Sequence, residues 1–134
     1  MTNPRSTRGP ASDDGVVASG VAIVAVEEAE RILEGGGEDV FSAAELAFAR
    51  ARVDPERRLA ARLAAKRAAV ELLGGGAALG EVEVLRADYG PPRLVLRGRA
   101  HERLRALGAS HALVSLTHER RHAAALVLLL RDDA

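Results

Sequence analysis

Two histidines near the end of the chain have the spacing of a zinc site. Residues 118–122 read H-E-R-R-H, and on a helix this spacing places two imidazoles on one face around a zinc ion, with Glu119 as the general base. The flanking residues 111–117 (HALVSLT) and 122–130 (HAAALVLLL) instead have the pattern of strands. We therefore predict that the motif is the polar turn of a hairpin, where the two imidazoles need not share a face, and not a zinc site.

Composition limits the classes of protein to which the chain can belong. Its 134 residues are enough for one domain with a buried core, which must consist of Ala, Val and Leu because only 2% of the residues are aromatic. The 19 basic and 19 acidic residues balance, which argues against a general nucleic-acid-binding protein. There is no cysteine, and no apolar run approaches the roughly 20 residues of a membrane span. We expect a cytoplasmic protein that binds neither nucleic acid nor membrane.

The first part of the chain predicts a tail followed by a strand and a helix. Residues 1–15 are polar and rich in Pro, Ser and Gly, which is typical of a disordered tail. We assign residues 16–134 to a single domain. Its first apolar run, residues 20–26 (GVAIVAV), predicts a buried strand. The helix predicted after it stops at the three glycines of positions 35–37.

Two further helices follow in the sequence. Ser42 and Glu45 have the spacing of a capping box, which predicts a helix that begins there and runs to about residue 53. Pro55 then suits the first turn of a long helix that ends at the glycines of positions 74–76. Four apolar residues of this long helix share one face, namely Leu59, Leu63, Val70 and Leu73.

The second half of the chain predicts two hairpins separated by a short helix. Residues 81–87 and 93–97 alternate as strands around a turn, and residues 98–107 predict a helix. The strands of residues 111–117 and 122–130 complete the chain. This order of elements predicts an α+β fold with an antiparallel sheet and one long helix.

Five segments between about residues 20 and 130 resemble motifs of one known family, the holo-acyl-carrier-protein synthases, which are small phosphopantetheinyl transferases. They occur in the family's order and spacing. The segments are GVAIVAV against G-x-D-I-V-E-I, FSAAE against F-[ST]-x-x-E, RLAARLAAKRAAVELLG against the family's K-E-A helix, YGPPRLVLRGRA against its G-K-P hairpin, and ALVSLTHE against its H-V-[ST]-L-[ST]-H-E strand.

The resemblance implies a fold, a reaction and an assembly. Members of the family transfer the phosphopantetheine arm of coenzyme A to a serine hydroxyl of an apo acyl carrier protein. They are homotrimers with active sites between subunits. Magnesium bridges the pyrophosphate and is held by the aspartate of G-x-D and the glutamate of K-E-A, because carboxylates orient the cation that neutralises the leaving group.

This chain departs from the family at the positions that carry the chemistry. Ala22 stands at the aspartate position and Arg67 at the K-E-A glutamate. Ala25, Glu71 and Pro91 replace a glutamate and two lysines of the family motifs. An arginine repels a dication and an alanine has no ligand atom, so we predict no metal at these positions. Arg67 and Glu71 have the spacing of an ion pair on the helix surface, while the alternative is that the Arg67 guanidinium occupies the place of the metal.

Several residues still match the family's site. We predict that phosphate or another ligand binds Arg62, Lys66, Ser115 and Thr117, and that His118, Glu119 and Arg67 carry any catalysis that remains. The open alternative is that the basic residues form a solvated face and that His118 is only a turn residue. Positions 50–67 contain seven basic and two acidic residues, which favours docking of an acidic acyl carrier protein.

Three functions remain open on the sequence alone. In the first, the chain is a diverged homologue that has lost magnesium-dependent transfer and is reused in the cleft between subunits, for carrier-protein binding or another reaction of a fatty-acid or polyketide type of pathway. In the second, it is an active transferase that uses magnesium and coenzyme A with other ligands, such as Glu27, Glu28 or Glu45. In the third, it is a non-catalytic subunit of a homotrimer or mixed trimer. We prefer the first, in which no cofactor is expected.

Overall fold

The structure is a computed structural model that describes residues 15–86 and 90–132. The predicted tail, apart from Gly15, and part of the predicted turn before Pro91 lie outside these residues. The elements, in chain order, are β1 (Val16–Ala25), α1 (Val26–Glu34), α2 (Ala43–Arg50), α3 (Pro55–Leu72), the 3₁₀ helix η1 (Leu79–Glu81), β2 (Val82–Leu85), β3 (Arg93–Leu96), α4 (Gly98–Ala106), β4 (His111–His118) and β5 (His122–Leu130).

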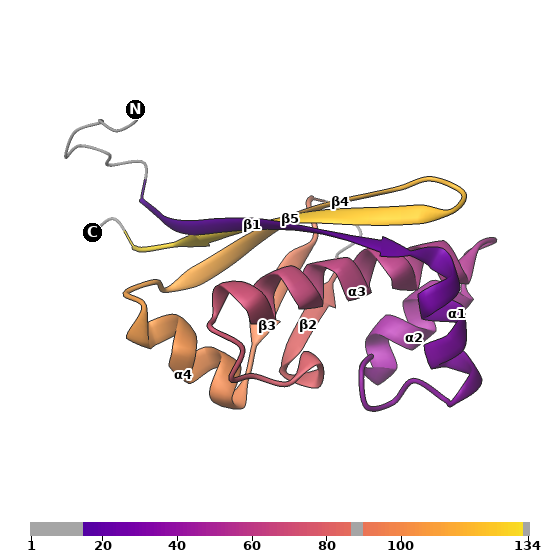
Figure 1. Cartoon of the computed structure of the whole chain (residues 1–134), viewed down its shortest axis with the longest axis horizontal. Helices are drawn as coiled ribbons and strands as arrows, with labels where there is room; N and C mark the ends of the chain where they lie inside the picture. Colours follow the sequence, from indigo (N-terminus) through magenta and orange to yellow (C-terminus); the bar gives the residue numbers. More distant parts are fainter. Residues whose placement is uncertain (1–14, 87–89, 133–134) are drawn as a thin grey trace.

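The strands form one antiparallel sheet in the order β1-β5-β4-β3-β2. The first and last strands of the chain therefore lie side by side, and Val24 of β1 pairs with Ala123 of β5. Figure 1 shows α3 lying along one face of the sheet and running opposite to β1, with α1 and α2 at the end where β1 finishes. The predicted α+β fold with an antiparallel sheet and one long helix is confirmed. No helix in the described part of the chain is long and apolar enough to cross a membrane.

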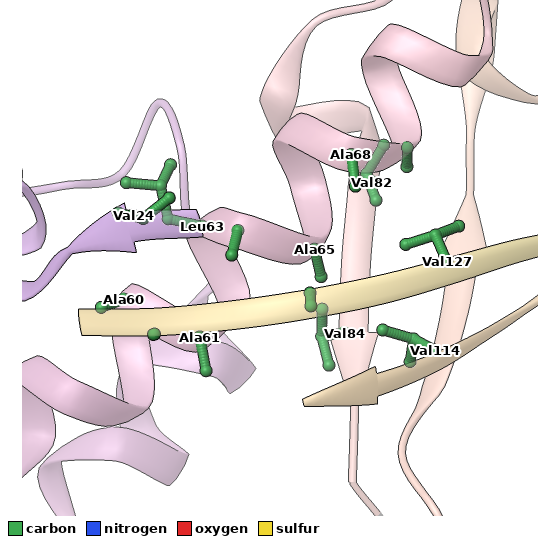
Figure 2. Close-up of a cluster of buried hydrophobic side chains, with 14 of the residues drawn as sticks. Val24, Ala60, Ala61, Leu63, Ala65, Ala68, Val82, Val84, Val114 and Val127 are labelled. Atoms are coloured by element: carbon green, nitrogen blue, oxygen red, sulfur yellow. The ribbon is translucent and has the colours of Figure 1, made fainter. Parts of the chain in front are cut away.

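The core lies between the sheet and α3. The predicted apolar face of α3 is confirmed at Leu59, Leu63 and Leu73, which are fully buried. The helix is nevertheless buried on more than that face, because small alanines let the sheet, α1 and α2 approach it closely; the buried alanines are Ala60, Ala61, Ala64, Ala65, Ala68 and Ala69. Figure 2 shows several of these side chains against the valines of the sheet. Because α3 is buried on nearly all sides, two of its basic residues, Arg62 and Lys66, are buried as well.

The ends of two elements differ from the predictions. Strand β1 begins at Val16 and not at Gly20, because pairing with β5 continues through residues whose side chains are only half-buried. Helix α2 ends at Arg50 and not near residue 53, since Pro55 restricts the residue before it and the chain needs a turn to enter α3. The capping box is confirmed: Glu45 N donates to Ser42 Oγ at 3.1 Å, and Ser42 N donates to Glu45 Oε1 at 2.8 Å.

The face of the sheet opposite α3 is apolar and exposed. Val21 and Ile23 of β1 are 61% and 70% exposed, and Leu113 of β4 and Leu126 of β5 also reach solvent. Side chains alternate along a strand, so these residues share the face that α3 does not cover. We call Val21, Ile23, Leu113 and Leu126 the outer apolar face. Contiguous apolar surface of this kind marks a place where another molecule binds.

Candidate functional site

The H-E-x-x-H segment is a turn between two strands, as the sequence predicts. β4 ends at His118 and β5 begins at His122, and the Glu119 N–H donates to the His122 carbonyl at 2.8 Å. His118 pairs with the buried Ala123, so its side chain lies on the α3 side of the sheet. His122 is adjacent to Ala123 and therefore projects to the other side. The two imidazoles therefore start from opposite faces of the sheet, unlike the histidines of a helical H-E-x-x-H zinc site, which share one face.

The polar groups of this turn have different partners. Glu119 accepts a hydrogen bond from the Arg121 N–H at 2.9 Å and lies 3.2 Å from His122 Nδ1. The backbone N–H of Arg121 is the main reason why the pKa of the exposed Glu119 carboxyl is lowered. His118 Nδ1 is buried and has no hydrogen-bond partner in the part of the chain that the structure describes. His118, Glu119 and His122 line a pocket of about 250 Å³ together with Thr117 and Ile23.

Lys66 lies inside the protein and not on a solvated face. Its side chain is 1% exposed, its ammonium Nζ lies 2.9 Å from Glu45 Oε1, and it also donates to the Val82 carbonyl. The second oxygen of Glu45 accepts the Val84 N–H at 2.7 Å. Burial is the main cause that lowers the pKa of Lys66, and Glu45 opposes it. Lys66, which the sequence predicts to bind a phosphate, is thus engaged in a buried ion pair that joins α2, α3 and β2.

Arg62 is buried and pairs with no carboxylate of residues 15–86 and 90–132. It is 3% exposed, its Nη1 donates to the Arg58 carbonyl at 3.3 Å, and its buried Nε has no partner within the same ranges. Its guanidinium carbon lies 4.3 Å from the centroid of the Phe48 ring, a cation–π contact. Burial lowers the pKa of Arg62 to about 10; Glu45 opposes this, and the positive charges of Arg86, Arg58 and Arg52 add to it. A buried guanidinium among other cations is a group that an anion would stabilise.

Arg67 has a different partner from the one that its helix spacing predicts. Its Nη2 donates to Glu28 Oε2 of α1, 39 positions earlier in the chain, and does not pair with Glu71. Both side chains are about one-third exposed. The hydrogen bond from Arg67 is the main cause that lowers the pKa of Glu28. The pair joins α1 to α3 at the end of β1.

Acidification is expected to remove the contribution of the Glu28–Arg67 pair to stability. Because the folded-state pKa of Glu28 lies below the ordinary value of 4.5, the contribution is complete above about pH 4.5 and is lost as the pH falls through the folded pKa. For a partly exposed pair we expect about 0.2–1 kcal/mol. Urea unfolding of the wild type and of Arg67→Gln, from about pH 7 to 3, should show a difference that shrinks on acidification. A difference that grows would contradict this account.

Ser115 and Thr117 lie on the side of the sheet away from α3. Both are exposed, and Ser115 lines a shallow hollow of about 230 Å³ together with Leu113 and Leu126 of the outer apolar face. The predicted site residues thus form two groups. Arg62, Lys66 and Arg67 belong to α3, whereas Ser115, Thr117, His118 and Glu119 belong to β4 and its turn. Within one chain, the sheet separates Ser115 and Thr117 from the first group.

The residues at the family's metal positions do not fit a magnesium ion. Ala22 offers only a methyl group, and the Arg67 guanidinium would repel the cation. The Glu28 carboxylate of α1 is already paired with Arg67. In the ranges 15–86 and 90–132, no group of three His, Cys, Asp or Glu side chains is placed to hold a metal. Any retained magnesium-dependent transfer would need a different set of metal ligands.

The fold defines a class of known proteins. The chain superimposes on the holo-acyl-carrier-protein synthase of Neisseria meningitidis with a TM-score of 0.72 at 21% identity, covering 87% of this chain and 99% of that one. The Bacillus anthracis synthase, solved in complex with coenzyme A (3′,5′-ADP), gives a TM-score of 0.70 at 23% identity, with 87% and 98% covered. At these identities the likeness shows the fold alone.

Relatives with similar sequences show to which family the chain belongs. The chain is 39% identical to the holo-[acyl-carrier-protein] synthase of Halorhodospira halophila, over 86% of this chain and 98% of that protein. It is 35% identical to the Moorella thermoacetica synthase, over 85% and 94%. No protein-family model matches the chain. The chain belongs to the holo-acyl-carrier-protein synthase family.

The sequence did not predict Glu83 or Arg97 as part of the site: Glu83 is a buried member of the polar network, and the partly exposed Arg97 pairs with it. Glu83 Oε1 accepts from Arg97 Nη1 at 2.7 Å, and Glu83 Oε2 accepts from Ser42 Oγ at 2.6 Å. Burial opposes ionisation, but these two donors lower the pKa of Glu83. The one indication in the sequence that Glu83 is buried is its place between Val82 and Val84, in a strand that the structure buries on both faces.

Proposed function

We propose that this chain is a family member that has lost magnesium-dependent phosphopantetheine transfer and that binds an acyl carrier protein without modifying it. The observation that carries the proposal is the pair of replacements at the metal positions, Ala22 and Arg67. The buried Lys66–Glu45 pair and the core around α3 remain intact, so the fold has been kept while the metal ligands have not. In this proposal the protein acts in the cytoplasm, within a fatty-acid or polyketide type of pathway.

The proposal includes a homotrimer. The outer apolar face supports it, because Ile23 and Val21 are too exposed to contribute to the core of one chain and would be buried by a second copy. The pocket formed by Thr117, His118 and Ile23 opens beside this face. A neighbouring subunit would therefore complete the pocket and bring its own residues to it. His118, whose buried Nδ1 has no partner, is the group in this pocket that we propose as acid or base for any other reaction there.

The charges favour one region for docking of the carrier protein. Helix α1 carries four glutamates and a single arginine, so it repels an acidic partner. Arg50 and Arg52, at the end of α2 and in the turn that follows, are exposed. Arg52 also lies 4.2 Å from the Phe48 ring, on the ring that Arg62 contacts. We propose that an acidic carrier protein docks on the Arg50–Arg52 region.

Binding of a labelled apo acyl carrier protein, followed by fluorescence anisotropy, tests the proposal. We expect wild-type affinity to fall as salt rises, since exposed charges are screened. The double variant Arg50→Glu, Arg52→Glu should bind at least about tenfold more weakly, a change of 1.4 kcal/mol. The matched control is Arg105→Glu on α4, which changes the net charge at a distant exposed position. Absence of wild-type binding, or an equal loss in the control, would contradict the proposed docking.

A further inference from the structure

Arg67 and Ala22 lie at the same level of α3 and β1 (Figure 1), although they are 45 positions apart in the chain. Gly20 of β1 lies against Leu72 of α3, because a Cβ added at Gly20 would lie 3.1 Å from the Leu72 side chain. The strand and the helix run in opposite directions (Figure 1). Two strand residues rise by roughly 6.6 Å and four helix residues by about 6 Å. Moving from Gly20 to Ala22 therefore leads from Leu72 to the level of Arg67 and Ala68.

Glu28 of α1 pairs with Arg67. It lies in the first turn of α1, which follows β1 directly, and it accepts the hydrogen bond from Arg67 Nη2. Ala22, Glu28 and Arg67 thus come from β1, α1 and α3 to one junction. The charges of Arg67 and Glu28 sum to zero. The charges of a divalent cation and its two carboxylate ligands also sum to zero, so the replacement leaves the net charge of the junction unchanged.

We infer that the Arg67 guanidinium, held by Glu28, takes the place of a divalent cation and binds a phosphate-bearing ligand without metal. The inference rests on the proposed loss of magnesium dependence and adds the group that replaces the metal. A guanidinium presents five donors in a planar fork that matches two phosphate oxygens. Glu28 accepts a hydrogen bond from Nη2, and the Arg67 side chain is 39% exposed. We therefore propose that the other N–H groups of the guanidinium bind a ligand that enters from solvent.

Manganese binding tests the replacement. Free Mn²⁺ gives an electron paramagnetic resonance signal that bound Mn²⁺ loses. We expect wild-type protein to leave this signal unchanged. The double variant Ala22→Asp, Arg67→Glu should deplete it, because three carboxylates, including the freed Glu28, then meet at the junction. Depletion by the wild type that Glu28→Gln abolishes would overturn the inference. So would a double variant that has a cooperative melt but binds no Mn²⁺.

Pyrophosphate binding tests the ligand. Calorimetry in the presence of EDTA should show wild-type protein binding inorganic pyrophosphate, with at least tenfold weaker binding for Arg67→Gln. Glu28→Gln should bind more tightly, since it removes the anion that competes for the guanidinium. Arg105→Gln on α4 is the control, and it should match the wild type. Equal binding by Arg67→Gln and the wild type would overturn the inference. A transfer reaction that runs in EDTA would instead contradict the proposed function and leave the role of Arg67 standing.

Discussion

Replacing Lys66 by alanine is expected to destabilise the protein by about 3–5 kcal/mol. The substitution removes the ammonium that lies 2.9 Å from the fully buried Glu45 carboxylate. Glu45 would then lie in an apolar surrounding without its cationic partner, with the N–H groups of Ser42 and Val84 as remaining donors. Equilibrium urea unfolding of the wild type and of Lys66→Ala measures the loss.

A second variant separates the lost ion pair from lost packing. In the double variant Lys66→Met, Glu45→Gln both charges are removed together, and the glutamine oxygen can still accept one of the backbone hydrogen bonds. Replacement of a whole buried pair is often nearly neutral, so this variant should recover most of the stability. If Lys66→Ala stays within about 1 kcal/mol of the wild type, or the double variant is equally unstable, Lys66 does not form the buried pair described here.

Replacing Ile23 by glutamate is expected to convert the proposed trimer into a monomer. Ile23 is 70% exposed in the single chain, so the change should leave the folded monomer intact. At an interface the new carboxylate would be buried without a partner, which costs several kcal/mol at each of three symmetry-related positions. Light scattering coupled to size-exclusion chromatography measures the mass of the assembly directly.

The control for this experiment is Val53→Glu. Val53 lies in the turn before α3 and is fully exposed, so the substitution changes the same charge on an apolar residue outside the outer apolar face. We expect Val53→Glu to remain trimeric. A wild-type protein that is monomeric, or an Ile23→Glu variant that keeps the wild-type mass, would show that the outer apolar face has another occupant.

The fold could be predicted because its signals are local. Ser42 and Glu45 specify the start of α2 through a capping box whose two hydrogen bonds are both present. The alternation of β4 and the apolar run of β5 placed H-E-x-x-H in a turn, and the structure confirms this placement. Such signals depend on residues within a few positions of one another, so a single sequence carries them.

The state of the basic residues of α3 could not be predicted in the same way. Arg62 and Lys66 are separated by a leucine and two alanines, so the sequence allows either a solvated stripe or a buried one. Their burial depends on how closely the sheet and α2 approach the alanines of α3. The partner of Arg67 depends on how α1 folds back against α3, since Glu28 is 39 positions away. These contacts result from tertiary packing, which no local pattern specifies.

The most direct test of the central claim is the intact mass of an apo acyl carrier protein after incubation with this protein, coenzyme A and magnesium. A holo-acyl-carrier-protein synthase of known activity serves as the positive control in a parallel reaction. The account predicts no increase in mass, because Ala22 and Arg67 cannot hold the magnesium ion. An increase equal to one phosphopantetheine group would contradict it and would show that other side chains bind the metal.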